Sequence, residues 1–193
     1  MLVAPVKFNC NMLYTGKGDK GTTKTLTTPE RIPKNSPVIE ALGAVDELNA
    51  WLGYSRAKLN DFSLPTESWP TMAEALLATQ ENLFIIQGEL AGAKLSINKA
   101  KVDEVETVIN EIEKKLSPIN SFLIPGQSEA SALCDVGRTL ARRAERMIVA
   151  CLNQIKFSEE SLAYMNRLSS LLYALARYIN EQKNIKELLP SYK

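Results

Sequence analysis

The chain has 193 residues, which is the size of a single domain with room for a sizeable core. Hydrophobic residues make up 45% of the sequence and charged residues 23%, as in ordinary globular proteins, and the net charge is only +1. A charge so near zero gives no general attraction to nucleic acid or to an acidic membrane, so any anion site must be local. The sequence contains no histidine, which excludes Ser-His-Asp triads, Glu-x-x-His di-iron sites and zinc sites that need imidazole.

The cysteines and the N-terminal residues indicate the compartment. Cys10, Cys134 and Cys151 lack the spacing of a metal site, and their odd number indicates reduced thiols in a reducing compartment. No apolar run is long enough to span a bilayer. Residues 1–16 lack the three regions of a signal peptide and the arginine-rich pattern of a transit peptide. We therefore expect a cytoplasmic protein without membrane association, and a processed mitochondrial form stays open as the alternative.

Residues 11–28 form a loop that alternates glycine with lysine and continues with threonines. Gly16, Gly18 and Gly21 permit positive φ and close backbone approach, so successive N–H groups can point into one concavity and hold an anion. The lysines would supply positive charge, and the threonine hydroxyls could bond phosphate oxygens. The P-loop pattern G-x-x-x-x-G-K-[ST] is absent. Two interpretations stay open, a phosphate-binding loop and a flexible polar arm.

Three prolines follow this loop and predict an extended segment over residues 29–37. Pro29, Pro33 and Pro37 fix their own φ and restrict the residues before them. Lys34 lies in this segment, either as a further phosphate contact or as a solvated lysine. We take residues 1–37 as an N-terminal segment that precedes the main body of the chain.

Apolar spacing predicts five helices within residues 38–183, and no strand pattern competes anywhere in the chain. The helices are expected near residues 38–52, 71–93, 102–116, 128–152 and 158–183. Gln87, Gly88 and Gly92, late in the second helix, indicate close packing against a neighbour or a ligand. Short loops marked by proline join the helices, so the prediction is an all-α, five-helix up-and-down bundle that forms one domain over residues 1–193.

The predicted fourth helix carries a row of arginines. Arg138, Arg142 and Glu145 fall at i, i+4 and i+7, so they share one face, and Arg146 continues it. Like charges at this spacing repel by roughly a few tenths of a kcal/mol per pair. A bound anion would offset the repulsion, and arginine suits phosphate because its planar fork donates two parallel hydrogen bonds. A solvated basic face crossed by Glu–Arg pairs is the alternative interpretation.

Six motifs in order now carry a resemblance. They are YTGKGDKGTT (14–23), GAVDELNAWLG (43–53), GELAG (88–92), FLIPG (122–126), GRTLARRAERMIV (137–149) and YMNRLSSLLYALAR (164–177). With them the chain resembles the PduO-type ATP:cob(I)alamin adenosyltransferases over nearly its whole length. Each motif alone would be weak, whereas the combination is specific to this family.

This resemblance implies a fold and a reaction. The fold would be a five-helix bundle of the ferritin-like, cobalamin adenosyltransferase-like kind that assembles as a homotrimer with active sites between adjacent subunits. The substrates would be ATP, with Mg²⁺, and cob(I)alamin, and the products adenosylcobalamin and tripolyphosphate. A reductase and a cobalamin-dependent mutase would be possible partners. The nucleophile is Co(I), so the protein needs to supply position and charge stabilisation rather than a nucleophilic side chain, which agrees with a chain that has no histidine.

The resemblance also implies roles for particular residues. The ATP-binding residues would be Thr15, Gly16, Lys17, Gly18, Thr23, Lys24, Lys34, Arg142, Arg143, Glu145, Arg146 and Asn166. Of the arginine row, Arg138, Arg142 and Glu145 would be catalytic. Arg138 would also pair across the subunit interface with Asp46. Phe122 would lie beside the corrin and help keep the lower ligand off cobalt, and no side chain is implied as a metal ligand.

The chain departs from the family pattern at a few positions. Cys134 and Asp135 stand where leucine and histidine are usual, Gly137 replaces an alanine, and an extra residue lies between the glycine loop and Lys34. The C-terminus is short beside relatives that carry further corrin-covering residues. Two other classes of function stay open, an ATP-binding sensor or cobalamin escort without turnover, and an adaptor bundle with a solvated basic face. Nucleic-acid binding would need a more basic chain with clustered aromatics.

Overall fold

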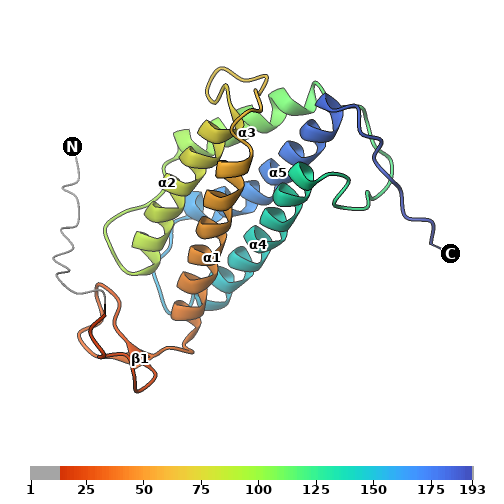
Figure 1. Cartoon of the computed structure of the whole chain (residues 1–193). Coiled ribbons are helices and arrows are strands. Elements are labelled where there is room, and N and C mark those ends of the chain that lie inside the picture. The colour runs from red at the N-terminus through yellow and green to blue at the C-terminus, as the bar shows by residue number, and fades with distance from the viewer. Residues whose placement is uncertain (1–13, 193) are drawn as a thin grey trace.

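Five helices form one bundle in the computed structural model, which describes residues 14–192 (Figure 1). The helices are α1 (Pro37–Lys58), α2 (Met72–Leu90), α3 (Lys99–Glu113), α4 (Glu129–Cys151) and α5 (Glu159–Gln182). Both α4 and α5 begin and end within one residue of the prediction, whereas α3 begins three residues earlier than predicted and α1 continues past residue 52. The predicted helical architecture is confirmed.

Polar side chains fix where the helices begin. Thr71 and Glu74 form a capping box at the start of α2, in which the Thr71 hydroxyl accepts from the Glu74 N–H at 3.2 Å and the Glu74 carboxylate accepts from the Thr71 N–H at 3.0 Å. Ser158 caps α5 with a single bond, in which its hydroxyl accepts from the Ser161 N–H at 3.1 Å. Pro37 occupies the first turn of α1, where its missing N–H has no intrahelical partner to lose.

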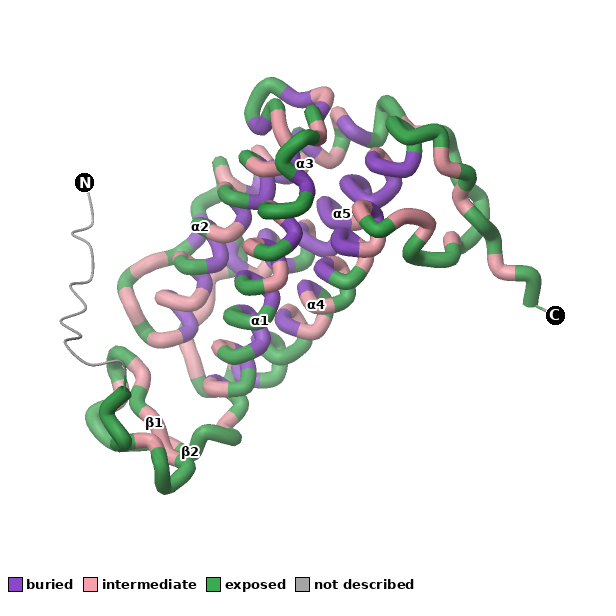
Figure 2. The backbone as a smooth tube through the Cα atoms, viewed as in Figure 1, coloured by how far each residue is buried: buried purple, intermediate pink, exposed green. Residues whose placement is uncertain are grey.

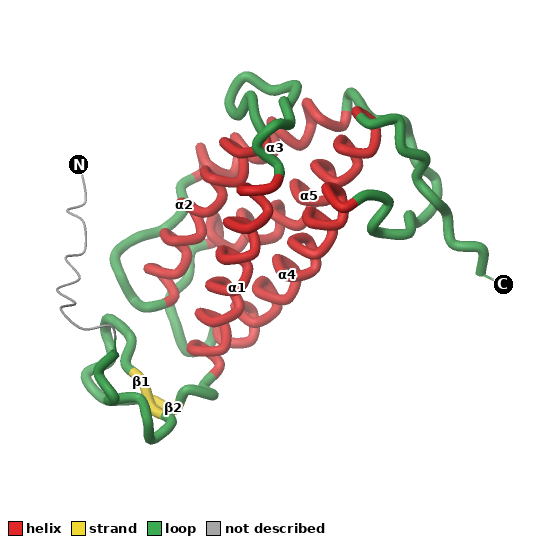
Figure 3. Tube along the Cα trace, viewed as in Figure 1, coloured by secondary structure: helices red, strands yellow, loops and turns green. Residues whose placement is uncertain are grey.

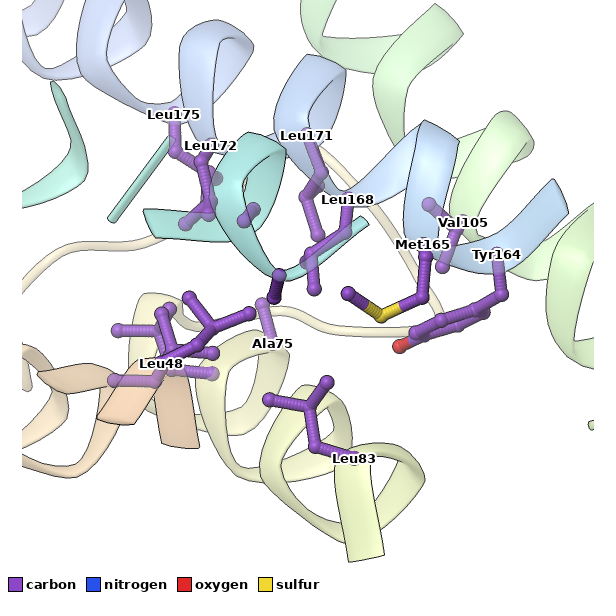
Figure 4. Close-up of a cluster of buried hydrophobic side chains, with 14 of the residues drawn as sticks. Leu48, Ala75, Leu83, Val105, Tyr164, Met165, Leu168, Leu171, Leu172 and Leu175 are labelled. Atoms are coloured by element: carbon purple, nitrogen blue, oxygen red, sulfur yellow. The ribbon is translucent and has the colours of Figure 1, made fainter. Parts of the chain in front are cut away.

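The core lies between the helices rather than along any one of them (Figure 2). Figure 4 shows Leu48 of α1, Leu83 of α2, Val105 of α3 and Leu168 of α5 converging, and all four are fully buried. Burying a side chain of this size contributes about 1.5–3 kcal/mol to folding. In space α1 packs on α2 and α4, while α5 packs on α4 and α3. Helices α4 and α5 therefore lie side by side, with α3 against the other flank of α5.

The N-terminal segment contains a short strand pair that the sequence analysis did not predict. Strand β1 (Thr22–Thr23) pairs antiparallel with β2 (Ile32–Pro33), with Thr22 opposite Pro33 (Figure 3). The prediction that the chain has no strand is wrong here, because two residues are too few to give an alternating pattern. A proline can occupy β2 because a two-stranded sheet has only edge strands.

The N-terminal hairpin and the segment 117–127 lie at opposite ends of the bundle. Figure 1 shows β1 beside the start of α1 and the connection from α3 to α4 at the far end, near the C-terminus. Both segments are mostly exposed (Figure 2). Within residues 14–192 no helix is both long and apolar enough to cross a membrane.

Candidate functional site

A cavity of about 890 Å³ opens between α3, α4, α5 and the segment 117–127. Its lining residues are Ile109, Glu113, Leu116, Ile119, Asn120, Ser121, Phe122, Leu123, Arg138, Arg142, Ser169, Ser170, Tyr173, Ala174 and Arg177. Three predicted site residues, Phe122, Arg138 and Arg142, therefore line one hollow. Phe122 is 79% exposed and is available to a ligand. An apolar hollow with a few cationic groups suits a large ligand that carries negative charge at one side.

Arg138 and Arg142 lie one turn apart on α4. Arg138 is half-buried, and its Nε has no hydrogen-bond partner among the described residues. The nearest carboxylate oxygen, Oδ1 of Asp135, is 3.7 Å from that Nε. Asp135 in turn accepts a hydrogen bond of 3.0 Å from the N–H of Gly126. Asp135 thus ties the segment 117–127 to α4 beside an arginine whose donors are uncommitted, a role that the sequence analysis, which noted Asp135 only as a departure, did not foresee.

Arg177 of α5 is a second residue that the sequence analysis did not assign to the site. Its guanidinium donates to the Ser117 carbonyl at 2.9 Å and lies 3.1 Å from the Glu187 carboxylate. The Ile124 N–H donates to the Leu188 carbonyl at 2.8 Å. These contacts hold the tail after α5 against the segment that carries Phe122. The only sequence signal was that an arginine interrupts the apolar periodicity of α5.

Glu145 and Asn166, both predicted to contact nucleotide, are brought together by α4 and α5. The Asn166 side-chain amide donates to the Glu145 carboxylate at 2.9 Å. The Asn166 oxygen accepts from Arg167 at 2.8 Å, and Arg167 donates to Glu106 of α3 at 2.7 Å. This chain of bonds fixes the orientation of Asn166. The sequence did not predict the contact of Glu106 with Arg167, because local spacing does not show which residues of α3 pack against α5.

The structure separates the other arginines of α4. Arg143 faces α1 and forms an ion pair with Glu47, and neither residue is among those that line the cavity. Both side chains are roughly half exposed, so the pair adds little stability. Arg146 is exposed. Asp46, also exposed, accepts a bond of 3.3 Å from Gln87, so the predicted pairing with Arg138 does not occur within one chain.

The glycine-rich loop folds back onto Lys34. Gly16 and Gly21 have φ of +66° and +71°, as expected for a loop that needs glycine. The Lys34 N–H donates to the Gly21 carbonyl at 2.9 Å. The Lys34 ammonium lies so close to Gly18 that a Cβ there would be 3.1 Å from Nζ. The structure therefore brings together Gly18 and Lys34, which the sequence analysis had grouped without a contact.

The remaining predicted loop residues lie near this turn. The Thr15 hydroxyl accepts from the Lys17 N–H at 3.4 Å, and both side chains are exposed. Thr23 lies in β1, and the Lys24 ammonium donates to the Pro29 carbonyl at 2.7 Å. The predicted ATP-binding residues thus form two groups in one chain, one in the loop and one at α4 and α5, and Figure 1 shows the loop at the opposite end of the bundle from the segment 117–127.

The cysteines of the bundle are structural. Burial, and to a smaller extent the nearby Asp135, raise the pKa of the Cys134 thiol from its usual 9.0 to about 12. Burial also raises the pKa of the Cys151 thiol. A thiol that stays protonated is a poor nucleophile and a poor metal ligand. Across residues 14–192 no three or more Asp, Glu or Cys side chains gather where they could hold a metal ion. Cys10 lies outside the described residues.

Comparison with known proteins gives consistent matches. A family model described as cobalamin adenosyltransferase matches residues 13–179. The corrinoid adenosyltransferase PduO of Salmonella typhimurium is 37% identical over 172 residues, which cover 86% of this chain and 48% of the relative. The corrinoid adenosyltransferase of Bacillus subtilis is 32% identical over 180 residues, covering 91% of this chain and 90% of the relative. The chain therefore spans about half the length of the Salmonella protein and nearly all of the Bacillus one.

Solved structures show the same likeness. A variant PduO-type ATP:corrinoid adenosyltransferase from Lactobacillus reuteri, complexed with cobalamin and ATP, superposes with a TM-score of 0.83 at 28% identity. The match covers 93% of this chain and 97% of that one. A second variant from the same organism, also complexed with cobalamin and ATP, gives a TM-score of 0.81 at 29% identity, over 93% and 99% of the two chains.

Proposed function

Because the chain belongs to the cobalamin adenosyltransferase family, we propose that it transfers the 5′-deoxyadenosyl group of ATP to the cobalt of cob(I)alamin. The electron pair of Co(I) forms the Co–C5′ bond, the C5′–O bond breaks, and tripolyphosphate leaves with the electrons of that bond. The observation that carries the proposal is the cavity in which Phe122, Arg138 and Arg142 meet.

The cavity supplies what this reaction needs from a protein. Co(I) is itself the nucleophile, so the side chains must position the substrates and stabilise the charge that develops on the leaving group. Arg138 and Arg142 would stabilise that charge through the paired N–H donors of their guanidiniums. Phe122 would lie against the corrin and keep the lower ligand from cobalt. Glu145 and Asn166, already bonded to each other, would hold the nucleotide beside the arginines.

The N-terminal loop would hold the triphosphate. The glycines and threonines offer backbone and hydroxyl donors, and Lys17, Lys24 and Lys34 offer positive charge, which together suit a polyanion. Mg²⁺ would enter with ATP and be held through phosphate oxygens, as is usual for this ion.

We further propose that each active site is shared between two chains of a homotrimer. The loop and the segment 117–127 lie at opposite ends of one bundle, so the loop of one subunit would complete the cavity of the next. Asp46 is exposed on α1, where it could reach the Arg138 of a neighbouring subunit, whose side chain is partly exposed in the cavity wall. An interface of this head-to-tail kind closes into a ring when the rotation is threefold.

The activity is tested by incubating the purified protein anaerobically with ATP, Mg²⁺ and chemically reduced cob(I)alamin while the corrin spectrum is followed. The proposal expects ATP-dependent formation of light-sensitive adenosylcobalamin. ATP binding without product would instead favour the sensor or escort function, and no binding of either substrate would reject the proposal.

The shared site is tested by subunit complementation. Lys17→Ala removes a loop cation and Arg142→Ala a cavity cation, so each variant alone should be nearly inactive. After the two are unfolded together and reassembled in equal amounts, about a quarter of the sites would combine an intact loop with an intact cavity. Mixing Lys17→Ala with Lys34→Ala, both in the loop, is the matched control and should restore nothing. Failure of the first mixture to regain activity would contradict a site between subunits.

A further inference from the structure

The GELAG motif ends α2 in a tight turn that only glycine can complete. The Ala93 N–H donates to the Gly88 carbonyl at 2.8 Å, and the Gly92 N–H donates to the Glu89 carbonyl at 2.9 Å. This pair of bonds is a Schellman motif, in which the residue after the C-cap adopts the left-handed conformation. Gly92 has that conformation, with φ of +91°.

The N-terminal loop rests on this glycine. The Leu26 N–H donates to the Ala91 carbonyl at 3.2 Å, and the Thr27 hydroxyl lies 3.5 Å from the same oxygen. A Cβ placed on Gly92 would be 2.2 Å from Oγ1 of Thr27, 2.6 Å from its Cγ2 and 2.9 Å from its Cβ. Since all three distances are below van der Waals contact, no residue larger than glycine fits while Thr27 keeps its place.

The turn itself is held from its other side. Glu89 is buried, and its carboxylate accepts a hydrogen bond of 2.6 Å from the Ser158 N–H and another from the Ser161 hydroxyl at the start of α5. Moving the turn to relieve a clash at Gly92 would break these buried, charge-assisted bonds. The loop, whose side chains are largely exposed, is therefore the part that must give way.

A displacement at Thr27 would reach the residues proposed to hold the triphosphate. Thr27 lies between β1 and β2, where Thr25 and Thr28 bond each other, hydroxyl to hydroxyl, at 3.0 Å. The base of this hairpin is the bond from the Lys34 N–H to the Gly21 carbonyl. The hairpin is thus one small unit that packs on the end of α2. A shift of Thr27 should therefore also move Gly21 and Lys34 at the other end of the hairpin.

We propose that the contact between Gly92 and Thr27 fixes the position of the N-terminal loop. Gly92 is then a positioning residue for ATP binding, although it contacts no substrate. This inference rests on the proposed function, because it takes the loop to be the triphosphate site. It explains why the glycine is needed at the end of α2, where the close packing indicated by the sequence has the loop as its partner.

The test measures the affinity for MgATP by titration calorimetry and the affinity for cobalamin by its absorbance change. Gly92→Ala should weaken MgATP binding by about tenfold to a hundredfold, the range expected for a misplaced binding group. Cobalamin binding should be unchanged. Adding Thr27→Gly to Gly92→Ala removes all three contacting atoms and should restore most of the MgATP affinity, which a merely structural role would not predict.

A second variant tests the same contact from the loop side, without backbone strain at residue 92. Thr27→Phe enlarges the loop side of the contact and leaves the sequence of α2 unaltered, so it should weaken MgATP binding as Gly92→Ala does. If Gly92→Ala does not fold, the MgATP affinity of Thr27→Phe still tests the contact.

The inference is overturned if Gly92→Ala or Thr27→Phe binds MgATP as the wild type does. It is also overturned if the double variant recovers nothing, since strain at residue 92 rather than contact with Thr27 would then be the cause. A wild-type protein that binds no MgATP would overturn the proposed function and this inference with it, whereas a normal wild type with unaffected variants would overturn this inference alone.

Discussion

Removing the negative charge of Glu187 should loosen the wall of the cavity and destabilise the protein. The Glu187 carboxylate lies 3.1 Å from Nε of Arg177, and the two side chains are only 18% and 10% exposed. Taking one partner from a fully buried ion pair costs about 3–5 kcal/mol, whereas an exposed pair contributes about 0–1 kcal/mol. Glu187→Gln keeps the shape and one oxygen acceptor, so we expect a loss between these limits, about 2 kcal/mol.

The assay is urea unfolding at pH 7 followed by circular dichroism, with a thermal melt beside it. For a chain of this length, 2 kcal/mol corresponds to a fall in Tm of about 4–8 °C. Cobalamin affinity should also fall, because Arg177 and the tail together hold the segment that carries Phe122. MgATP affinity should fall less than cobalamin affinity, because the contacts of Arg177 and the tail hold the segment that carries Phe122 rather than Arg142 on α4.

An exposed ion pair provides the matched control. Lys99 and Asp103 lie one turn apart on α3 with side chains 80% and 50% exposed, so Asp103→Asn should leave the urea midpoint where it is. If Glu187→Gln is as silent as Asp103→Asn, or if it lowers MgATP affinity as much as cobalamin affinity, the tail does not anchor the cavity wall in the way described.

Four further predictions follow from the site. Arg142→Ala should lower kcat/KM for ATP by about tenfold to a hundredfold, because it removes a charge-assisted phosphate contact typically worth about 1.5–3 kcal/mol; unchanged steady-state kinetics would exclude the residue from the site. Phe122→Ala should impair turnover from Co(II) more than turnover from pre-reduced Co(I), and equal losses would reject its role against the lower ligand. Asp46→Asn should loosen the trimer, which sedimentation velocity would detect, and an intact, fully active trimer would contradict the pairing with Arg138. The Cys134 thiol has a pKa of about 12 in the native protein and about 9 in the unfolded chain, so between these pH values only the native thiol keeps its proton. The free energy of unfolding should therefore fall as pH rises from 9 to 12, by at most about 1.4 kcal/mol per pH unit. Urea midpoints at pH 8 and pH 10.5 measure this fall, which Cys134→Ala should reduce and which a flat profile would contradict.

Local sequence signals were enough for the helices and for the shared face of two arginines. The serines before α4 and α5 and the apolar spacing within them place both helices to a residue, because caps and periodicity act over one or two turns. The same spacing put Arg138 and Arg142 on one face, and the structure has both in one cavity.

Contacts between distant segments were beyond those signals. Arg143 was grouped with Arg142, yet its partner Glu47 is known only once α1 is placed beside α4. Arg177 interrupts the apolar spacing of α5, but its role depends on contacts with the tail after that helix. The strands β1 and β2 have no pattern at all. These features depend on tertiary packing, which a single sequence does not encode in its local spacing.

The turn that ends α2 also links the opening motions of two segments. Through Ala91 it holds the N-terminal loop, and through Glu89 it holds the first turn of α5, so the loop and the helix share one point of attachment although they are far apart in the sequence. When that turn frays, both lose a hydrogen bond at once. The amide protons of Leu26 and Ser158 should therefore exchange with solvent through one common opening event.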